Sequence, residues 1–520
     1  MTRSRLAINS ANYKWWALGV TSIGSFMSIL DTSIVNIALP KMMAVFSATT
    51  DQAQWILTAY MLTMGVLQPV TGYLCDTYGT RRMYLVSLAL FTAGSALCGA
   101  AWSNDTMILF RVIQGVGGGF IIPVTMTIVY HCFAPAERNM AMGIWGISAM
   151  VAPSVGPTLS GYLVDYWDWR FIFTINIPIG VIGYFAAMVV LQETELIRGR
   201  RFDFWGVATA ALGLFCLLLA LNKGVEEGWS SAYIVTLFYM AAASLSLFVA
   251  IELQHENPIL DLTLFRDWNF AWSSIVTFIN TAVLFGSIFL VPLFMENLQG
   301  YDAMDTGILL FPSAMVAGLM MPVAGKLADR FGAKPLVILG GIFLGLSTVP
   351  LQTIDLDTSY HHIMVVQMLR GLGLGLSMMT VTVLGMSTVP MAKISRASAL
   401  NNTLRQISGS LGIAVLSTVL QNRQIWHQAR IAENMNLNSL ATGKFIDYGE
   451  KMFGHMGDVA ALAHKKSLIL LNNVMLRQSS VFSFDDAFWV LGAICALGVL
   501  AALLLKPTGR SGKTVEVMLD

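Results

Sequence analysis

Charged residues are scarce in this chain, and their scarcity limits the classes of protein it can belong to. Only 12% of its 520 residues are Asp, Glu, Lys or Arg, against about 25% in typical soluble domains. The formal net charge is +1, so no basic surface indicates nucleic-acid binding. The five cysteines are scattered and include no Cys-x-x-Cys pair, which argues against disulfides and against a metal site. No G-x-x-x-x-G-K-[ST] phosphate loop or nucleophile constellation is present, so an enzyme is disfavoured.

Hydrophobic residues make up 56% of the chain and gather into long apolar stretches. A bilayer core requires about 20 apolar residues per helix. The sequence predicts fourteen such spans, at 15–39, 52–74, 83–102, 106–131, 140–164, 170–191, 203–222, 232–253, 270–295, 306–328, 335–354, 361–388, 397–420 and 485–505. The first stretch is too long for a signal-peptide core, so we expect it to remain as a span. The predicted fold class is an all-α membrane protein with 14 transmembrane helices.

Basic residues are distributed unequally between the loops on the two sides of the predicted membrane. The short loops on one side carry only Lys41, Arg170 and Lys223, whereas the loops on the N-terminal side carry most of the Lys and Arg. The positive-inside rule therefore places both termini in the cytoplasm. One long segment of mixed charge, 421–484, falls on the outer side and is too polar to span.

One short pattern, G-x-L-x-D-x-x-G followed by basic residues, occurs twice on the charged bridges between spans. It follows the second and the tenth predicted span. The copies consist of Gly72, Asp76, Gly79, Arg81 and Arg82, and of Gly325, Asp329, Arg330 and Gly332. The aspartates are suited to bind a helix N-terminus or nearby arginines, so we interpret the pattern as a cytoplasmic clasp that holds one conformation shut. A role in topology alone would explain the arginines but neither the glycines nor the aspartates.

The spacing of the two copies predicts the domain organisation. Such internal repeats are typical of transporters built from two related halves. Halves of six spans would place the second copy after the eighth span, so its position after the tenth indicates two inserted spans. We expect an N-terminal six-helix bundle at 1–194, two inserted linker helices at 195–262, and a C-terminal six-helix bundle at 263–520 that includes the outer loop 421–484. The inserted spans are not expected to line the central path.

Asp31 is an acidic residue inside an otherwise apolar span. Such a residue costs roughly 2.5–3.5 kcal/mol on insertion scales, so a partner or a function is expected. At 1.5 Å per residue, Asp31 lies roughly 12 Å and Arg111 of the fourth span roughly 8 Å from the outer surface. We therefore expect them to pair, either as a proton-coupling carboxylate that responds to a movable arginine or to substrate, or as a permanent structural salt bridge.

Four further polar residues within the spans are candidates for the substrate path. Asn36 follows Asp31 in the first span, and Gln114 lies three residues after Arg111. Arg370 opens a glycine-rich stretch similar to the one that follows Arg111, and Arg405 has no obvious acidic partner. The glycines of both stretches are also typical of simple close helix packing.

The fifth span contains two prolines with glycines beside them. These residues are Pro153, Gly156, Pro157 and Gly161. Proline removes an internal hydrogen bond and kinks a helix, while glycine permits a neighbouring helix to approach. The pattern indicates either a bending, leak-sealing element between the halves or a static kink.

These motifs together resemble the major facilitator superfamily, and within it the fourteen-span drug:proton antiporter branch of the EmrB/QacA type. The resemblance covers residues 15–506. The loop at 72–82 resembles the superfamily signature, with Thr77 where a basic residue is common. The segment 30–40 resembles the first-span signature of the fourteen-span branch.

Two more motifs extend the resemblance. Arg111 matches the fourth-span arginine that the family links to proton transfer, and residues 152–161 resemble the antiporter motif of the fifth span, with Ser160 where glycine is usual. The resemblance implies a major facilitator fold and a proton-coupled multidrug efflux antiporter of a bacterial inner membrane that confers antibiotic resistance. Such a protein exports hydrophobic or amphipathic compounds, uses the proton gradient as its driving force and needs no cofactor.

The long outer segment is similar to that of pumps that work with a periplasmic adaptor and an outer-membrane channel. Those two proteins are therefore candidate partners beside the lipid bilayer and hydrophobic small-molecule substrates, although QacA-type pumps also extend this loop. Two alternatives stay open. One is a dedicated exporter of a single metabolite, lipid or siderophore, and the other is a non-transporting membrane receptor or sensor, which the lack of a signalling domain disfavours.

Overall fold

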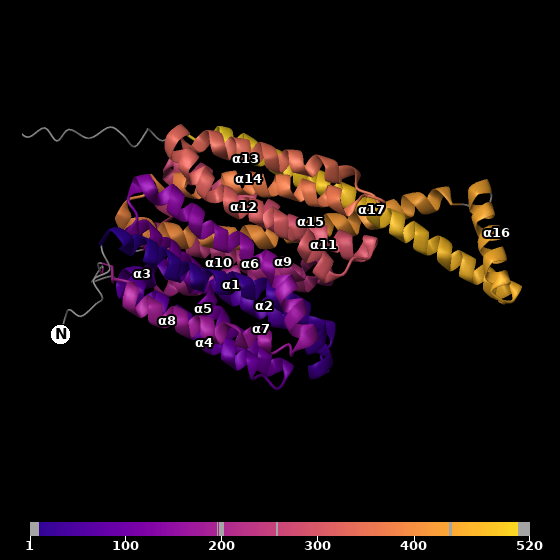
Figure 1. The fold of residues 1–520 in the computed structure, drawn as a ribbon, viewed down its shortest axis with the longest axis horizontal. Coiled ribbons are helices and arrows are strands. Elements are labelled where there is room, and N and C mark those ends of the chain that lie inside the picture. Colours follow the sequence, from indigo (N-terminus) through magenta and orange to yellow (C-terminus); the bar gives the residue numbers. More distant parts are fainter. Residues whose placement is uncertain (1–9, 195, 197–201, 256–257, 436–438, 508–520) are drawn as a thin grey trace, which may run out of the picture.

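The computed structural model describes residues 10–194, 196, 202–255, 258–435 and 439–507. Within these ranges the chain forms helices and no strand. Most helices run side by side in one elongated bundle, and α16 lies apart at one end of it (Figure 1). The two copies of the repeated pattern lie at the opposite end, which we call the motif end; the end that carries α16 is the hairpin end.

Every predicted span corresponds to a helix or to a short series of helices. In chain order these are α1 (Ser10–Phe46), α2 (Thr50–Leu67), η1 (Gln68–Val70), α3 (Thr71–Tyr78), α4 (Thr80–Gly99), α5 (Asn104–Cys132), η2 (Pro135–Glu137), α6 (Arg138–Tyr166), α7 (Phe171–Thr174), α8 (Asn176–Val190), α9 (Phe204–Glu227), α10 (Ala232–Gln254), η3 (Leu262–Arg266), α11 (Trp268–Phe294), η4 (Met295–Gln299), α12 (Ala303–Phe331), α13 (Ala333–Thr348), η5 (Val349–Thr353), α14 (Tyr360–Met386), η6 (Met391–Lys393), α15 (Ile394–Asn434), α16 (Leu440–His455) and α17 (Ala460–Leu503).

Thirteen described helical segments are long and apolar enough to cross a membrane. The remaining predicted span, 52–74, is formed by α2, η1 and α3 in succession. Its break falls at Pro69 in η1, because proline has no N–H for the helical ladder. These helices support the fold class predicted from hydropathy.

Glycines bring corresponding helices together in the N-terminal and C-terminal parts of the bundle. A Cβ added to Gly115 of α5 would lie 3.1 Å from the Tyr60 carbonyl oxygen of α2. A Cβ added to Gly375 of α14 would lie 2.8 Å from the Ala317 carbonyl oxygen of α12. A larger residue would force these backbones apart, so both glycine-rich stretches serve close helix packing.

The inserted helices α9 and α10 pack against each other, and α9 also lies against α2 and α15. Leu218 of α9 is buried and would contact a Cβ placed on Gly65 of α2. Beyond α9, Trp229 Nε1 donates a hydrogen bond to Thr418 Oγ1 of α15 at 2.9 Å. Helix α9 thus contacts helices from both the N-terminal and the C-terminal parts of the bundle. Of the linker bounds predicted at 195–262, the first falls among residues outside the described ranges.

The outer segment 421–484 is not an extended loop. Its described residues continue α15 and α17 beyond the bundle and add α16, which packs against α17 (Figure 1). We call residues 421–484 the outer hairpin. Contacts that join its helices include His464 Nδ1 of α17, which lies 2.5 Å from Glu450 Oε1 of α16. A Cβ on Gly449 would meet Ser467.

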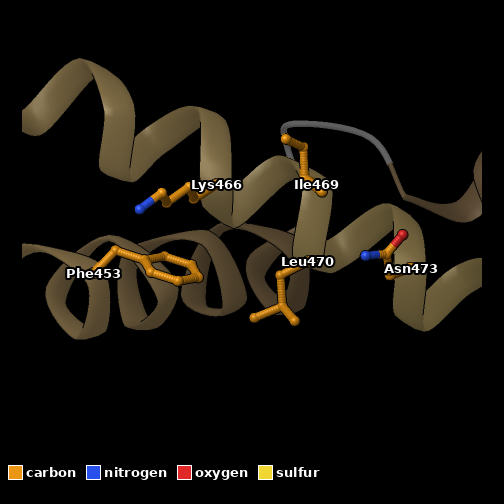
Figure 2. Close-up of a pocket in the computed structure, with 5 residues that line it drawn as sticks. All are labelled: Phe453, Lys466, Ile469, Leu470 and Asn473. Atoms are coloured by element: carbon orange, nitrogen blue, oxygen red, sulfur yellow. The ribbon is translucent and has the colours of Figure 1, made fainter. Parts of the chain in front are cut away.

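A small pocket lies between α16 and α17 in the outer hairpin. Phe453 of α16 and four residues of α17 line it, namely Lys466, Ile469, Leu470 and Asn473 (Figure 2). The Lys466 ammonium group lies 5.6 Å from the Phe453 ring centroid. The pocket is part of a helix–helix contact and lies far from the bundle interior (Figure 1).

Candidate transport site

Asp31 of α1 and Arg111 of α5 form an ion pair inside the first half. Arg111 Nη1 lies 2.5 Å from Asp31 Oδ2, and neither residue is exposed. Arg111 Nε also donates a hydrogen bond to the Ile56 carbonyl oxygen at 3.1 Å. The guanidinium carbon lies 4.1 Å from the centroid of the Tyr60 ring, which is a cation–π contact. The two residues meet as their estimated depths in the membrane predict.

Gln114 completes this network one turn along α5. Its Nε2 donates to Asp31 Oδ1 at 2.8 Å, and its Oε1 accepts from Arg111 Nη1 at 2.8 Å. The same Nε2 lies 3.1 Å from Ser95 Oγ. The sequence assigned Gln114 to the substrate path, but its side chain is fully buried within the ion-pair network. No solute can therefore reach it while the network stays closed.

This arrangement makes the packing of helices depend on the charge of Asp31. The Asp31 carboxylate balances the charge of Arg111, and both side chains are fully buried. Protonation of Asp31 would leave the Arg111 charge buried and unpaired, which is strongly unfavourable. A conformation that gives Arg111 other contacts is then favoured. The role of this network in proton coupling stays a prediction.

At the motif end, the first copy of the repeated pattern packs against the start of α15 in the other half. A Cβ added to Gly72 would lie 2.9 Å from Arg396 Cα, so only glycine permits this approach. Asp76 Oδ2 lies 3.6 Å from Arg396 Nε, and Arg396 Nη1 lies 3.9 Å from Asp261 Oδ2. Lys393 Nζ also pairs with Asp261, at 2.6 Å.

Asp261 lies between the inserted helices and the second half, outside the membrane-spanning segments. Burial opposes its ionisation, but hydrogen bonds from Lys393 and Thr263 outweigh burial and lower the pKa of this carboxyl. Asp261 is therefore a negative charge at neutral pH, held between two basic residues of α15 and its preceding turn. We call Asp76, Asp261, Lys393 and Arg396 the motif-end clasp.

The basic residues of the first copy bind a carboxylate that the sequence did not indicate. Gly79 ends α3 with a φ of +91°, which favours glycine. Glu193 Oε1 then accepts from the Arg81 backbone N–H at 2.9 Å, at the start of α4. Glu193 Oε2 lies 3.8 Å from Arg82 Nε. A carboxylate at a helix N-terminus is stabilising, so Glu193 fixes the end of α8 to the start of α4.

The second copy makes a corresponding contact with the first half. A Cβ added to Gly325 would lie 2.6 Å from the Asn139 carbonyl oxygen at the start of α6, and Asp329 Oδ1 accepts from Asn139 Nδ2 at 2.7 Å. Gly332 ends α12 with a φ of +88°, and the Arg330 guanidinium lies over the neighbouring Phe331 ring at 5.3 Å. Each copy thus binds the first turn of a helix from the opposite half, and the motif end is closed.

The proline-containing span is the continuous helix α6, which lies between α1 and α12. A Cβ on Gly156 would collide with Ser33 of α1, and a Cβ added to Gly307 of α12 would lie 3.3 Å from Pro157 Cβ. Ser160 Oγ donates to the Ile34 carbonyl oxygen at 2.6 Å. Gly161, in contrast, has no neighbour within 4 Å of an added Cβ, so it does not serve close packing here.

The remaining substrate-path candidates lie in three different environments. Asn36 is exposed, and its Nδ2 lies 3.5 Å from the Thr32 carbonyl oxygen one turn earlier in α1. Arg370 is 2% exposed and reaches only Ser347 Oγ of α13, at 3.4 Å. Arg405 Nη2 donates to Thr382 Oγ1 of α14 at 2.6 Å. The structure therefore does not gather these residues into one site.

Three residues of the closed motif end were missed by sequence reasoning: Glu193, Asp261 and Arg396. Each is a charged residue near a helix end, and each has its partner far away in the sequence. Among the described residues, no group of three or more His, Cys, Asp or Glu side chains is placed to hold a metal ion.

Comparisons with known proteins agree with this fold. The sequence model of the Major Facilitator Superfamily matches residues 21–413. An uncharacterised MFS-type transporter, YhcA of Bacillus subtilis, is 32% identical over 491 residues, which cover 94% of this chain and 92% of that protein. The multidrug export protein EmrB of Escherichia coli K12 is 28% identical over 500 residues, covering 94% and 95%.

Among solved structures, the proton:xylose symporter XylE has a TM-score of 0.62 at 13% identity and covers 96% of this chain and 97% of its own. At that identity the likeness concerns the fold alone. The family match and the transporter relatives identify a multi-pass membrane transporter rather than an enzyme. The chain belongs to the major facilitator superfamily.

Proposed function

We propose that this chain is a proton-coupled multidrug efflux antiporter that exports hydrophobic or amphipathic compounds across a bacterial inner membrane. The observation that carries the proposal is the buried Asp31–Arg111 ion pair, closed by Gln114. A titratable group within the membrane marks an ion pathway more often than a structural element. The similarity to the multidrug export protein EmrB supports multidrug export as the activity.

In this proposal the motif end faces the cytoplasm, together with both termini. The motif-end clasp and the Asn139–Asp329 contact would hold the cytoplasmic side shut. Proton entry at Asp31 from the outer side would release Arg111 and favour a rocking of the two halves. The clasp would then open, substrate would enter from the cytoplasm, and proton release would restore the ion pair.

The proposal divides the chain as the sequence predicts, into bundles at 1–194 and 263–520 joined by the linker helices at 195–262. The inserted helices support the linker role because α9 lies across α2 of one half and α15 of the other. With this placement, α9 covers the seam from the lipid side while the central path remains between the halves.

The outer hairpin supports a further partner, a periplasmic adaptor that connects to an outer-membrane channel. Helix α17 has 44 residues, and at 1.5 Å per residue it extends about 66 Å, more than twice the roughly 30 Å of a bilayer core. The hairpin carries Tyr448, Met456 and Val459 with exposed fractions of 72–73%. Exposed apolar side chains that project this far from the bundle are suited to a protein contact.

Efflux of a lipophilic dye from energised cells tests the proposed function. We expect cells that express the chain to export several structurally unrelated dyes, and a protonophore to stop the export. Export of one compound only would favour a dedicated exporter of a single metabolite, lipid or siderophore. Absence of any gradient-dependent export, with the protein present in the membrane, would favour a receptor or sensor and would contradict the proposal.

A further inference from the structure

Arg405 is a partly buried cation for which the described residues supply no carboxylate partner. Its Nη2 donates to Thr382 Oγ1, and its Nε lies buried without a hydrogen-bond partner. No Asp or Glu among the described residues forms an ion pair with it. An uncompensated charge in a region of low dielectric is strongly unfavourable. Such a group is expected where a ligand completes its pairing.

The face of α15 that carries Arg405 points toward the first half. Two residues on that face contact α5: Ser398 Oγ donates to the Pro123 carbonyl oxygen at 3.0 Å, and Asn402 Nδ2 lies 3.7 Å from Met126 Sδ. Because residues three and four apart share a helix face, Arg405 follows Asn402 along the same line. It therefore lies between the two halves, where a transported compound would pass.

Arg405 also lies at the point where the tight contact between the halves ends. Ser398 and Asn402 are 0% and 4% exposed, whereas Arg405 is partly exposed. The contact between α15 and α5 therefore excludes solvent on the motif-end side of Arg405 but no longer does so at Arg405 itself. A cavity between the halves that opened toward the hairpin end would therefore end at the Arg405 guanidinium.

A second unpaired polar group lies beside it. The Tyr130 hydroxyl of α5 is buried and has no hydrogen-bond partner among the described residues. Tyr130 interacts electrostatically with Arg138, whose guanidinium carbon lies 5.2 Å from its ring centroid, and with Arg405. The Tyr130 phenol and the Arg405 guanidinium, which come from opposite halves, are both hydrogen-bond donors suited to an anion. Arginine in particular binds carboxylate or sulfonate groups through two parallel N–H bonds.

Methionines of α5 and α14, the helices that carry Tyr130 and Thr382, suit the apolar part of the same ligand. Met126, Met378 and Met379 belong to the buried core cluster that spans α5 and α14, and Met379 lies near Gly146 of α6. Methionine is flexible and polarisable, so it adapts to apolar groups of varied shape. A single positive charge beside an adaptable apolar surface matches an amphipathic anion.

We infer that Arg405, with Tyr130, binds the anionic headgroup of an exported amphiphile, so that the substrates include amphipathic carboxylates or sulfonates. This inference rests on the proposed export function and specifies one class of substrate. Arg370 does not share the role, since it contacts Ser347 of α13 within its own half.

Proteoliposomes that contain the full-length protein test the inference with two probes of opposite charge. One is taurocholate, an amphipathic sulfonate, and the other is ethidium, a lipophilic cation; the measured quantity is the ratio of their gradient-driven transport rates. We expect Arg405→Gln to lower the taurocholate-to-ethidium ratio about tenfold, since a charged hydrogen-bonded pair is lost. Arg405→Lys should lower it less because it keeps the charge, and Arg370→Gln should leave the ratio at its wild-type value.

Tyr130→Phe keeps the test decisive if Arg405→Gln does not fold. It removes only a hydroxyl that has no protein partner, so the fold is preserved, and the ratio should fall several-fold. A ratio that stays at the wild-type value in both variants would overturn the inference. If the wild-type protein transports ethidium but not taurocholate, the inference about anionic substrates is overturned while the export function stands. If it transports neither probe, both the inference and the proposed export function are contradicted.

Discussion

Replacement of Asp31 by asparagine should uncouple transport from the proton gradient without unfolding the protein. Asparagine keeps the shape of the side chain but carries no charge and cannot exchange a proton. Its Oδ1 can still accept from Gln114 Nε2, as Asp31 does at 2.8 Å. Arg111, however, loses the carboxylate that now lies 2.5 Å from its Nη1.

The expected loss of stability follows from this geometry. Removal of one partner from a buried ion pair is destabilising by about 3–5 kcal/mol. Arg111 keeps its bonds to the Ile56 carbonyl oxygen and to Gln114, and its contact with the Tyr60 ring. We therefore expect Asp31→Asn to lie near the lower end of that range. The double variant Asp31→Asn with Arg111→Gln should regain most of this stability, because it leaves no unpaired buried charge.

Transport in proteoliposomes separates the structural role of the pair from its coupling role. Both the single and the double variant should fail to move a dye uphill when a pH gradient is imposed, while each still exchanges dye down its own gradient. Asp51→Asn is the matched control, because that carboxylate is exposed in the first turn of α2. Uphill, gradient-driven transport by the double variant would refute the coupling role and leave Asp31–Arg111 as a structural salt bridge.

Three further changes probe the closed motif end and the outer hairpin. Gly325→Ala should loosen the motif end, because the added Cβ would lie 2.6 Å from the Asn139 carbonyl oxygen. Gly161→Ala is the control, because its added Cβ would meet no atom within 4 Å. The rate at which a cysteine introduced at Ser398 is labelled measures the difference between the two variants. The pKa of Asp261 is lower in the folded protein than the usual aspartate value of about 3.9. The stabilising charge of Asp261 is therefore fully present above that value, and it is lost only as the pH falls through the pKa that Asp261 has in the folded protein. The same labelling should therefore stay low in wild type at pH 5 and be raised at that pH by Asp261→Asn. Deletion of residues 430–476 should spare transport in reconstituted vesicles but lower drug resistance in cells that have an outer membrane, and equal loss in both assays would remove the argument for an adaptor.

Hydropathy was sufficient to predict the helices of the bundle, because each apolar stretch in the sequence is long enough to span a bilayer. The pairing of Asp31 with Arg111 was also predictable, since the rise per residue along each helix places both side chains at a similar depth in the membrane. The environment of Gln114 was less predictable than that of the ion pair. Its helical spacing put it near Arg111, but only the packing of α1 against α5 shows that it is sealed within the ion pair.

The helices of the outer hairpin were not predicted, because hydropathy reports which segments suit lipid rather than which segments are helical. A signal was present in the sequence. No glycine or proline occurs from residue 413 to 442 or from 458 to 491, so nothing interrupts α15 or α17 as they leave the bundle.

The motif-end clasp was beyond sequence reasoning for a different reason. Asp261 and Arg396 are visible as charges near helix ends, but the approach of α15 to α3 depends on how the halves close. The aspartates of the repeated pattern were expected to bind either a helix N-terminus or local arginines. Asp76 pairs with Arg396 in the first turn of α15, and Glu193 binds Arg81 and Arg82 of the loop.

The central claim is that export of a hydrophobic compound is coupled to proton movement in the opposite direction. The most direct measurement records proton flux and ethidium flux together in proteoliposomes that hold the wild-type protein. The account predicts that ethidium added on one side drives protons toward that side, and that an imposed pH gradient drives ethidium uphill. Ethidium movement that carries no proton flux and is unchanged when the gradient is collapsed would contradict it.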